Sequence, residues 1–386
     1  MKNTNKKNKL DKAKEIKEEE IKDKNMLKNS KKHNGIIGLW KFLFCIMVIL
    51  HHGKDFNYEN NKIIFGGGNI AVEFFFIVSG FLMAKNALNK KDCDEDNLGK
   101  ETFNYILKKI KGFLPYTIIA WIFLIIINNI FDTISIRNNI LSILDIFLLE
   151  MTGIKIKILN GPLWYISSML ICMSILYPLI RKYKYNYIYI FIPLSVLLIM
   201  GYSNHLFNNL KGIHEWVGFT YRGNLRAFVD LSIGIFIYAI SENFKNIKFT
   251  FIGKILLTII EFVGFIFPFI IGNFVKNPDQ FDIIAIIMIS ISILIAFSEK
   301  TLEFNIMNNK IVRFLERLSL SMYIFHLPVG KTMLYTKYFK RFTYIQNLFF
   351  FVLLTFIVSI ILTYIIDYLK KKNFYFDNIK KFILVK

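Results

Sequence analysis

The sequence has little cysteine and no group of residues spaced as metal ligands. Its three cysteines, Cys45, Cys93 and Cys172, lie far apart in the 386-residue chain. Zinc sites need cysteine or histidine ligands at short, paired spacings, and none is present here. Cys45 and Cys172 lie in apolar runs, where cysteine behaves as a small hydrophobic residue. The sequence therefore predicts neither a disulfide nor a metal site.

Basic stretches interleaved with aromatic residues are also absent, although the formal net charge is +21. Residues 1–34 hold twelve lysines and six acidic residues, with no aromatic residue and no periodicity. Such a composition predicts a disordered basic tail, whose lysines face anionic lipid headgroups and help to set the membrane topology. Nucleic-acid binding requires stacking aromatics beside the basic residues, so no nucleic-acid partner is expected.

Long apolar runs are what the sequence does contain. Hydrophobic residues make up 54% of the chain, with 40 Phe, and they form blocks of about 17–25 residues, the length that crosses a bilayer as a helix. A soluble core would scatter the same residues by helical or strand period. We therefore predict an all-α integral membrane protein, a bundle of about ten transmembrane helices whose partner is the lipid bilayer.

The ten predicted spans are residues 35–52, 69–88, 112–131, 162–181, 186–201, 224–242, 249–275, 281–298, 312–330 and 343–369. The segment 132–161 is apolar but short and carries two acids, which is compatible with a re-entrant or interfacial helix.

The polar segments between the spans carry the lysine asymmetry that fixes orientation. The asymmetry predicts a multi-pass protein of the cell membrane with both termini in the cytoplasm, although the basic 331–342 loop then falls on the outer side. The chain divides into a cytoplasmic tail at 1–34, a transmembrane domain at 35–370 and a cytoplasmic C-terminal tail at 371–386. We detect no internal repeat and no sizeable soluble domain.

The first span carries a cation and a histidine on one line. Lys41 and His52 are eleven residues apart, which on a helix is about 1,100°, close to three full turns, and about 16 Å of rise. The two side chains therefore point the same way from opposite ends of one helix. This arrangement suits a long anionic donor such as coenzyme A, whose phosphates and thioester lie at opposite ends. Alternatively, Lys41 snorkels to one interface and the histidines cap the helix at the other.

The second span contains an acid within an apolar run. An ionised Glu73 side chain is unfavourable in the bilayer unless it faces a partner or a water-filled cavity. In a hairpin it lies about one turn below the outer surface, near the expected depth of His52. A carboxylate beside an imidazole fixes its tautomer, so the pair can take a proton from a hydroxyl. The alternative is a structural ion pair between Glu73 and another helix.

These features resemble the acyltransferase 3 family of integral membrane acyltransferases, whose members carry Arg or Lys, ten residues and then His. Four later segments agree in order: VEFFFIVSGFL at 72–82, GPLWYISSMLICMSILYP at 161–178, RGNLRAFVDLSIGIFIY at 222–238 and LSLSMYIFHLPV at 318–329. The resemblance spans about residues 35–370. One branch of the family carries a Glu where Met169 stands here, so this chain resembles the other branch.

The resemblance implies a ten-helix bundle that transfers an acyl group, usually acetyl, from acyl-CoA to a hydroxyl of an envelope carbohydrate, with no permanently bound cofactor. It implies that His52 is the catalytic residue and Lys41 its basic companion. The family often places an R-x-x-R pair before a proline to hold the donor. Here that stretch is KKIKGFLP, with Lys108, Lys109 and Lys111, and lysine acts as a point charge rather than a bidentate fork.

Three further residues are candidates for the substrate site. His326 lies near the outer end of the ninth span, where it approaches the depth of His52 or is bonded to Ser319 or Tyr323. Arg222 and Arg226 stand one turn apart at the outer start of the sixth span. They either meet an anionic acceptor or anchor the interface, and Asp230 is the i,i+4 partner of Arg226.

The chemistry leaves two routes and one competing class. His52 either deprotonates the acceptor for direct attack or carries the acyl group itself. A transporter or flippase is the alternative, with Lys41, Glu73 and the histidines lining its path. The charges are concentrated in one hairpin rather than in broken helices of an inverted repeat, which favours an enzyme. A structural scaffold fits the Lys41–His52–Glu73 arrangement poorly.

Overall fold

The computed structural model describes residues 34–58, 62–91, 95–131, 135–207, 212–275, 281–302 and 309–371. The predicted tails, 1–34 and 371–386, and Cys93 fall outside these ranges except for the single residues 34 and 371. The α-helices are α2 Gly35–His52, α3 Ala71–Leu88, α4 Glu95–Phe131, α5 Ile136–Ser142, α6 Trp164–Asn186, α7 Ile192–Phe207, α8 Arg222–Phe244, α9 Phe251–Phe274, α10 Asp282–Ser298, α11 Lys310–Tyr335 and α12 Tyr344–Lys371.

Short elements connect these helices. One two-residue β-ribbon pairs β1 Trp216–Val217 with β2 Thr220–Tyr221. The 3₁₀ helices are Gly53–Phe56, Gly68–Ile70, Ile143–Phe147, Glu150–Thr152, Gly161–Leu163 and Tyr338–Arg341, and a π-helix spans Tyr187–Phe191. The prediction of an all-α bundle is therefore confirmed.

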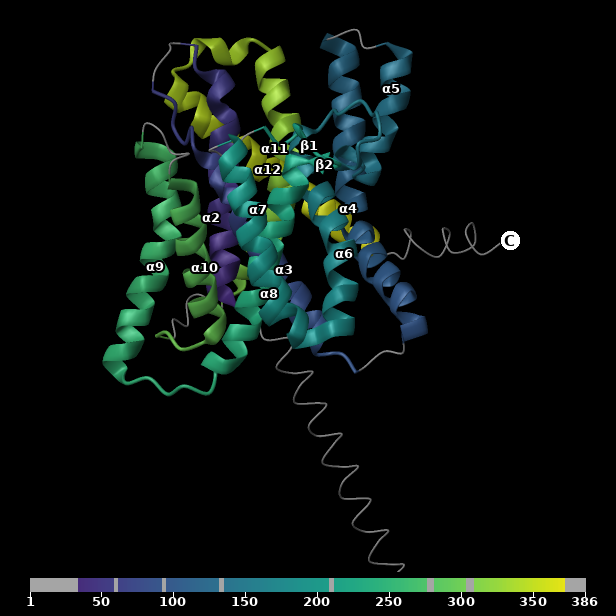
Figure 1. Ribbon diagram of the computed structural model, residues 1–386. Coiled ribbons are helices and arrows are strands. Elements are labelled where there is room, and N and C mark those ends of the chain that lie inside the picture. Colours follow the sequence, from purple (N-terminus) through teal and green to yellow (C-terminus); the bar gives the residue numbers. More distant parts are fainter. Residues whose placement is uncertain are drawn as a thin grey trace, which may run out of the picture.

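Ten of the helices account for the ten predicted spans (Figure 1). Seven helical segments are long and apolar enough to cross a membrane, and one of them, Gly161–Phe207, contains both α6 and α7. The shorter apolar helix α10 and helix α11 complete the set. The protein is therefore a multi-pass membrane protein.

Two predicted boundaries differ from the structure. The polar segment 89–111 separates two predicted spans, but most of it is helical, because α4 begins at Glu95 and runs for 37 residues. The segment is rich in Lys, a good helix former, so its charge did not exclude a helix. The gap between the predicted spans 162–181 and 186–201 lies within α6, and the helical path breaks at Lys184, whose φ is 46°.

The centre of the bundle is the contact between α3 and α8. A Cβ on Gly80 would lie 2.1 Å from the Leu231 carbonyl oxygen, and a Cβ on Gly234 would lie 2.0 Å from that of Ile77. Reciprocal glycines allow the two backbones to touch, as small residues do in membrane helix pairs. This contact fixes which face of α3 meets α8.

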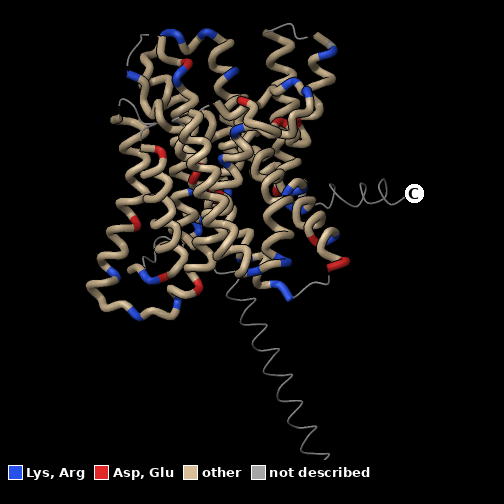
Figure 2. The backbone as a smooth tube through the Cα atoms, viewed as in Figure 1, with Lys and Arg blue, Asp and Glu red and all other residues tan. Residues whose placement is uncertain are grey.

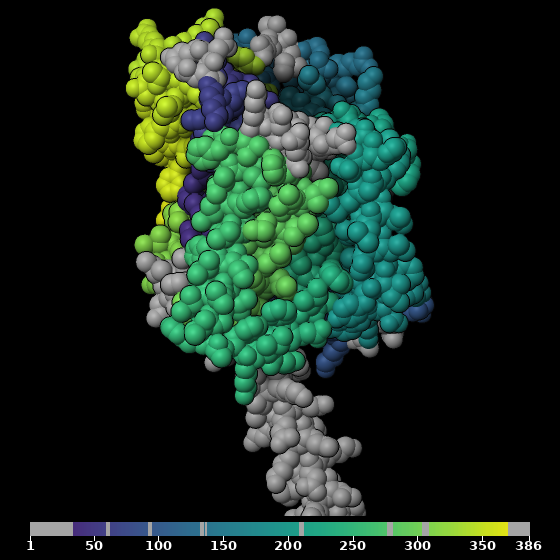
Figure 3. Space-filling model, turned by 60° about the vertical axis from the view of Figure 1, so that its left-hand side comes forward, coloured from purple at the N-terminus to yellow at the C-terminus, as the bar shows by residue number. Residues whose placement is uncertain are grey.

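The remaining helices surround this pair. Figure 1 places α9 and α10 on one side and α4, α5 and α6 on the other, and Figure 3 shows α9 and α10 forming an outer wall. In Figure 2, Lys and Arg gather toward the two ends of the bundle, with few charges between them. We call the ends the Gly35 end and the His52 end, after the termini of α2.

The segment 132–161 does not cross the bundle. Its described residues form α5 and two 3₁₀ turns at the His52 end (Figure 1), and the re-entrant or interfacial position stays a prediction. Asp145 stabilises the end of this segment, because its Oδ2 accepts hydrogen bonds from the backbone N–H groups of Leu159 and Asn160 at 3.1 Å each. The Asn160 amide in turn donates to the Ile324 carbonyl of α11.

Candidate active site

Helix α2 ends in the two adjacent histidines. His51 and His52 are half-buried, and their rings lie 5.4 Å apart. His51 Nδ1 donates to the Phe65 carbonyl at 3.1 Å, which ties α2 to the loop before α3. A Cβ on Gly68 would lie 2.7 Å from the His51 Cβ, so this loop reaches α2 only because position 68 is glycine. His51 therefore holds the loop against α2, and His52, the last residue of the helix, is the candidate for the catalytic role.

The structure brings His52 and His326 together. Their ring centroids are 5.0 Å apart, although the residues lie on α2 and α11. His326 is fully buried, and its Nδ1 donates to the Tyr323 carbonyl at 2.6 Å. The sequence offered a position near His52 or a bond to a neighbour such as Tyr323, and the structure shows both.

Glu73 pairs with an arginine of another helix and not with His52. Its Oε1 accepts a hydrogen bond from Arg226 Nε, and both residues are buried. Arg226 also donates to the Asn69 carbonyl at 2.9 Å, and Asp230 lies beside the Glu73 carboxyl. The structure therefore shows the ion pair given above as the alternative, in place of a Glu73–His52 pair. The reason is the close α3–α8 contact, which turns this face of α3 toward α8.

Arg222 lies one turn before Arg226 and is also buried. Its guanidinium carbon stands 4.0 Å from the centre of the Phe207 ring, and its Nη1 is 3.3 Å from Glu215 Oε2. Both arginines thus have protein partners. Their role in binding an acceptor stays a prediction.

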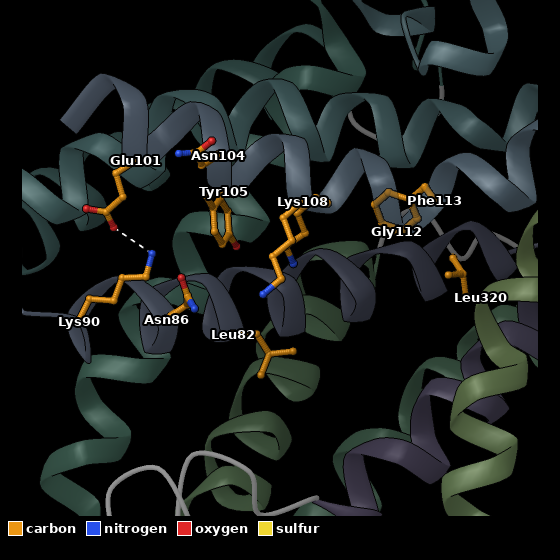
Figure 4. A pocket seen from close by; sticks show the side chains of 11 residues that line it. Leu82, Asn86, Lys90, Glu101, Asn104, Tyr105, Lys108, Gly112, Phe113 and Leu320 are labelled. Carbon is orange, nitrogen blue, oxygen red and sulfur yellow. Dashed lines mark hydrogen bonds and ion pairs between the residues drawn. The ribbon is translucent and has the colours of Figure 1, made fainter. Parts of the chain in front are cut away.

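A pocket of about 710 Å³ opens between α3, α4 and α11 at the Gly35 end. Its volume is in the range of small-molecule and cofactor sites. Figure 4 shows α3 and α4 side chains facing one another across it, with Lys90 and Glu101 at one end, Lys108 in the middle and Leu320 at the other end. The lining residues are Leu82, Asn86, Lys90, Glu101, Asn104, Tyr105, Lys108, Lys109, Gly112, Phe113 and Leu320.

A network of side chains braces the wall of this pocket. Arg181 donates to the Ala87 and Lys91 carbonyls at the end of α3 and to Glu101 of α4. Tyr177 donates to Glu101 at 2.7 Å, and its ring stacks on Tyr105 at 4.2 Å. The cavity between α3 and α4 is therefore held open by a fixed frame.

The predicted donor-binding lysines separate in the structure. Lys108 and Lys109 line the pocket, and Lys41 lies close enough to Lys109 to repel it electrostatically. Lys41 Nζ meets Glu316 Oε1 at 2.7 Å. Lys111 is exposed on α4 and is not among the lining residues. The structure thus brings Lys41, Lys108 and Lys109 together and leaves Lys111 outside.

A polar pair at the His52 end was not predicted from the sequence. His214 Nε2 lies 2.9 Å from Glu150 Oε1, and Glu150 is buried. Burial raises the pKa of Glu150 to about 7, against the hydrogen bond from His214, which lowers it. Burial likewise raises the pKa of Asp145 to about 6, although two backbone N–H groups oppose the rise. Glu150 and His214 are 64 residues apart, so no spacing in the sequence links them.

These features define a helical membrane protein with a basic pocket at one end and a histidine pair toward the other. A family model described as an acyltransferase domain, that of the acyltransferase 3 family, matches residues 34–368. The chain belongs to this family and is a membrane acyltransferase. The comparisons with curated proteins and with solved structures find no match.

Proposed function

We propose that the protein moves an acyl group, most simply acetyl, from acyl-CoA to a hydroxyl group of a cell-envelope or secreted carbohydrate. The observation that carries the proposal is the placement of two sites on one helix. Lys41 adjoins the basic pocket, and His52 stands eleven residues, about 16 Å, further along α2. That span fits a donor with phosphates at one end and a thioester at the other.

Several observations support the pocket as the donor site. Lys108 and Lys109 supply positive charge for phosphates, and Asn86 and Asn104 supply amide groups. Leu320 at the far end of the pocket lies six residues, about 9 Å, along α11 from His326. A flexible arm entering past the lysines is therefore directed toward the histidine pair.

The proposal fixes an orientation in the membrane. Acyl-CoA is a cytoplasmic donor, so the Gly35 end faces the cytoplasm and the His52 end faces outward. An even number of crossings then puts both termini in the cytoplasm. The acceptor carbohydrate meets His52 from outside, and His52 either deprotonates its hydroxyl or first takes the acyl group from the thioester.

The test is acetyl transfer in membrane vesicles that expose their cytoplasmic face and contain native envelope glycans. We expect label from acetyl-labelled acetyl-CoA to enter ester that mild base releases. His52→Ala should lower this transfer by about 1,000-fold or more, because the reacting group is lost. His205→Ala, at an exposed position on α7, is the matched control and should retain the wild-type rate.

Each outcome decides one part of the proposal. Transfer that survives His52→Ala would remove the catalytic assignment. Absence of transfer by the intact protein, with its expression verified, would remove acetyl-CoA as the donor. Label that enters protein or phospholipid rather than glycan would remove the carbohydrate acceptor and retain the transferase.

A further inference from the structure

A hydrogen bond within its own helix fixes the tautomer of the His326 ring. A backbone carbonyl can only accept a hydrogen bond, so the 2.6 Å contact with the Tyr323 carbonyl places a proton on Nδ1 of His326. In the neutral ring, the other nitrogen, Nε2, is then a bare lone pair. This Nε2 is buried and has no hydrogen-bond partner among the described residues. A buried acceptor without a donor is costly unless a donor comes to it.

Among the groups described around His326, one donor remains for that lone pair. His51 also faces His326, but its Nδ1 proton is donated to the Phe65 carbonyl, so the Nε2 of its neutral ring is an acceptor as well. Three aromatic rings are described around it, those of His52 at 5.0 Å, Tyr323 at 5.9 Å and Phe351 at 6.5 Å. Phe351 has no N–H or O–H group. The hydroxyl of Tyr323 is already donated to the Pro162 carbonyl at 2.6 Å. His52, the nearest of the three, has a ring N–H to give.

We propose that His326 is a positioning residue for His52: its Nε2 accepts the ring N–H of His52 and thereby fixes the tautomer and orientation of that ring. The inference rests on the proposed function, in which His52 does the chemistry. Ring centroids 5.0 Å apart leave room for a bond between two ring nitrogens, so a turn of the His52 ring is enough to align its N–H with His326 Nε2. Catalytic hydrogen bonds are often poorly aligned in a free enzyme and tighten in the complex. His52 is half-buried and His326 is fully buried behind it.

The role of the second histidine follows from the bond. With one ring N–H of His52 given to His326, the other ring nitrogen is a lone pair facing the substrates. In direct transfer, that nitrogen takes the hydroxyl proton, the oxygen bonds to the acyl carbon, the C–S bond breaks, and the thiolate recovers the proton from His52. In the two-step route, the nitrogen bonds to the acyl carbon and the C–S bond breaks, which releases the thiolate and leaves the acyl group on a charged imidazolium ring. The acceptor oxygen then bonds to the acyl carbon, the C–N bond breaks to restore neutral His52, and the hydroxyl proton is released and neutralises the thiolate.

Two substitutions separate a positioning role from a structural one. His326→Gln can keep an acceptor oxygen where Nε2 stands, whereas His326→Asn can keep a donor toward the Tyr323 carbonyl but is too short to reach His52. We expect His326→Asn to lower kcat for acetyl transfer by about 100-fold, in line with the loss of groups that orient a catalytic histidine. The KM for acetyl-CoA should change by less than about twofold, because the donor pocket is untouched. His326→Gln should recover most of the lost kcat.

The outcomes are distinct from those that test the function itself. A wild-type protein that fails to transfer acetyl refutes the proposed function. Wild-type transfer combined with equal kcat values for the Asn and Gln variants, or with an Asn variant as fast as wild type, overturns the role of His326. If the Asn variant does not accumulate, His326→Ala is assayed with and without added imidazole. Recovery of kcat by imidazole supports the role, and no recovery overturns it.

Discussion

The lysines show how a single charge depends on its surroundings. Lys108 and Lys109 line the pocket between α3, α4 and α11, and Lys41 lies near enough to repel Lys109 while it pairs with Glu316 of α11. Under the proposed function, a donor phosphate in the pocket would meet two lysines in its wall, and Lys41 could join them only by releasing Glu316. Lys111, one turn of helix away, has the same chemistry but lies outside the pocket.

Lys109→Gln and Lys111→Gln therefore form a matched pair. We expect Lys109→Gln to raise the KM for acetyl-CoA by about tenfold, the loss of one charge-assisted contact of about 1.4 kcal/mol, with kcat unchanged. Lys111→Gln should shift the KM by less than about twofold. Initial rates against acetyl-CoA concentration measure both, and equal effects in the two variants would refute the assignment of the pocket.

At the scale of single residues, the sequence predicted that Lys41 and His52 lie on one helix, and both side chains contact α11. For Glu73 the sequence left two partners open, and the structure shows the ion pair with another helix. Helical period gives the direction of a side chain relative to its own helix, whereas the partner depends on which neighbouring helix faces it. The pairs Glu73–Arg226 and Glu150–His214 join residues 153 and 64 positions apart, and nothing local indicates such pairs.

Among the elements, α3 and α8 depend on each other most directly. Both cross the bundle with glycines at their point of contact, and each glycine is met by the other helix's carbonyl. The apolar runs predicted both helices to within a few residues. They did not predict the contact, because run length reports burial in lipid or protein and not the choice of neighbour. Helix α4 shows the opposite case. Its first part is rich in lysine and was not predicted as part of a span, yet it is helical from Glu95.

Gly80→Val tests the α3–α8 contact. Its side chain would meet the Leu231 carbonyl at a distance that no Cβ tolerates, so the helices must separate. We expect a loss of stability of more than about 3 kcal/mol and little folded protein in detergent by size-exclusion chromatography. Gly99→Val is the control, because no atom lies within 4 Å of a Cβ at that position. A Gly80→Val protein as abundant and as stable as this control would contradict the contact.

For the molecule as a whole, the two ends differ in the kind of polar group they hold. The Gly35 end gathers lysines around a pocket, whereas the His52 end holds buried acids in the turns after α5. These acids make stability depend on pH. Because the pKa of Glu150 is about 7 when folded and near 4.5 when unfolded, the folded protein binds more protons between these pH values. Stability therefore falls as pH rises through this window, and Asp145 acts in the same direction.

Thermal unfolding of the detergent-solubilised protein at pH 5 and at pH 8 measures this dependence. We expect the wild type to melt at the lower temperature at pH 8, with Glu150 accounting for up to about 3 kcal/mol. Glu150→Gln, which stays neutral, should remove much of the difference, while His205→Gln should not. A Glu150→Gln protein that keeps the full wild-type difference between pH 5 and pH 8 would contradict the raised pKa of Glu150.

No glycine or proline interrupts α2 between Lys41 and His52, so the helix keeps the two residues at a constant separation. The helix therefore sets a fixed distance between any two groups bound at its ends. If the pocket holds the phosphates of the donor, as proposed, the thioester carbonyl would be delivered at a fixed distance from them whatever acyl chain it bears. A longer chain would then extend past His52, so the room beyond the histidine, rather than the pocket, would select which acyl group is transferred.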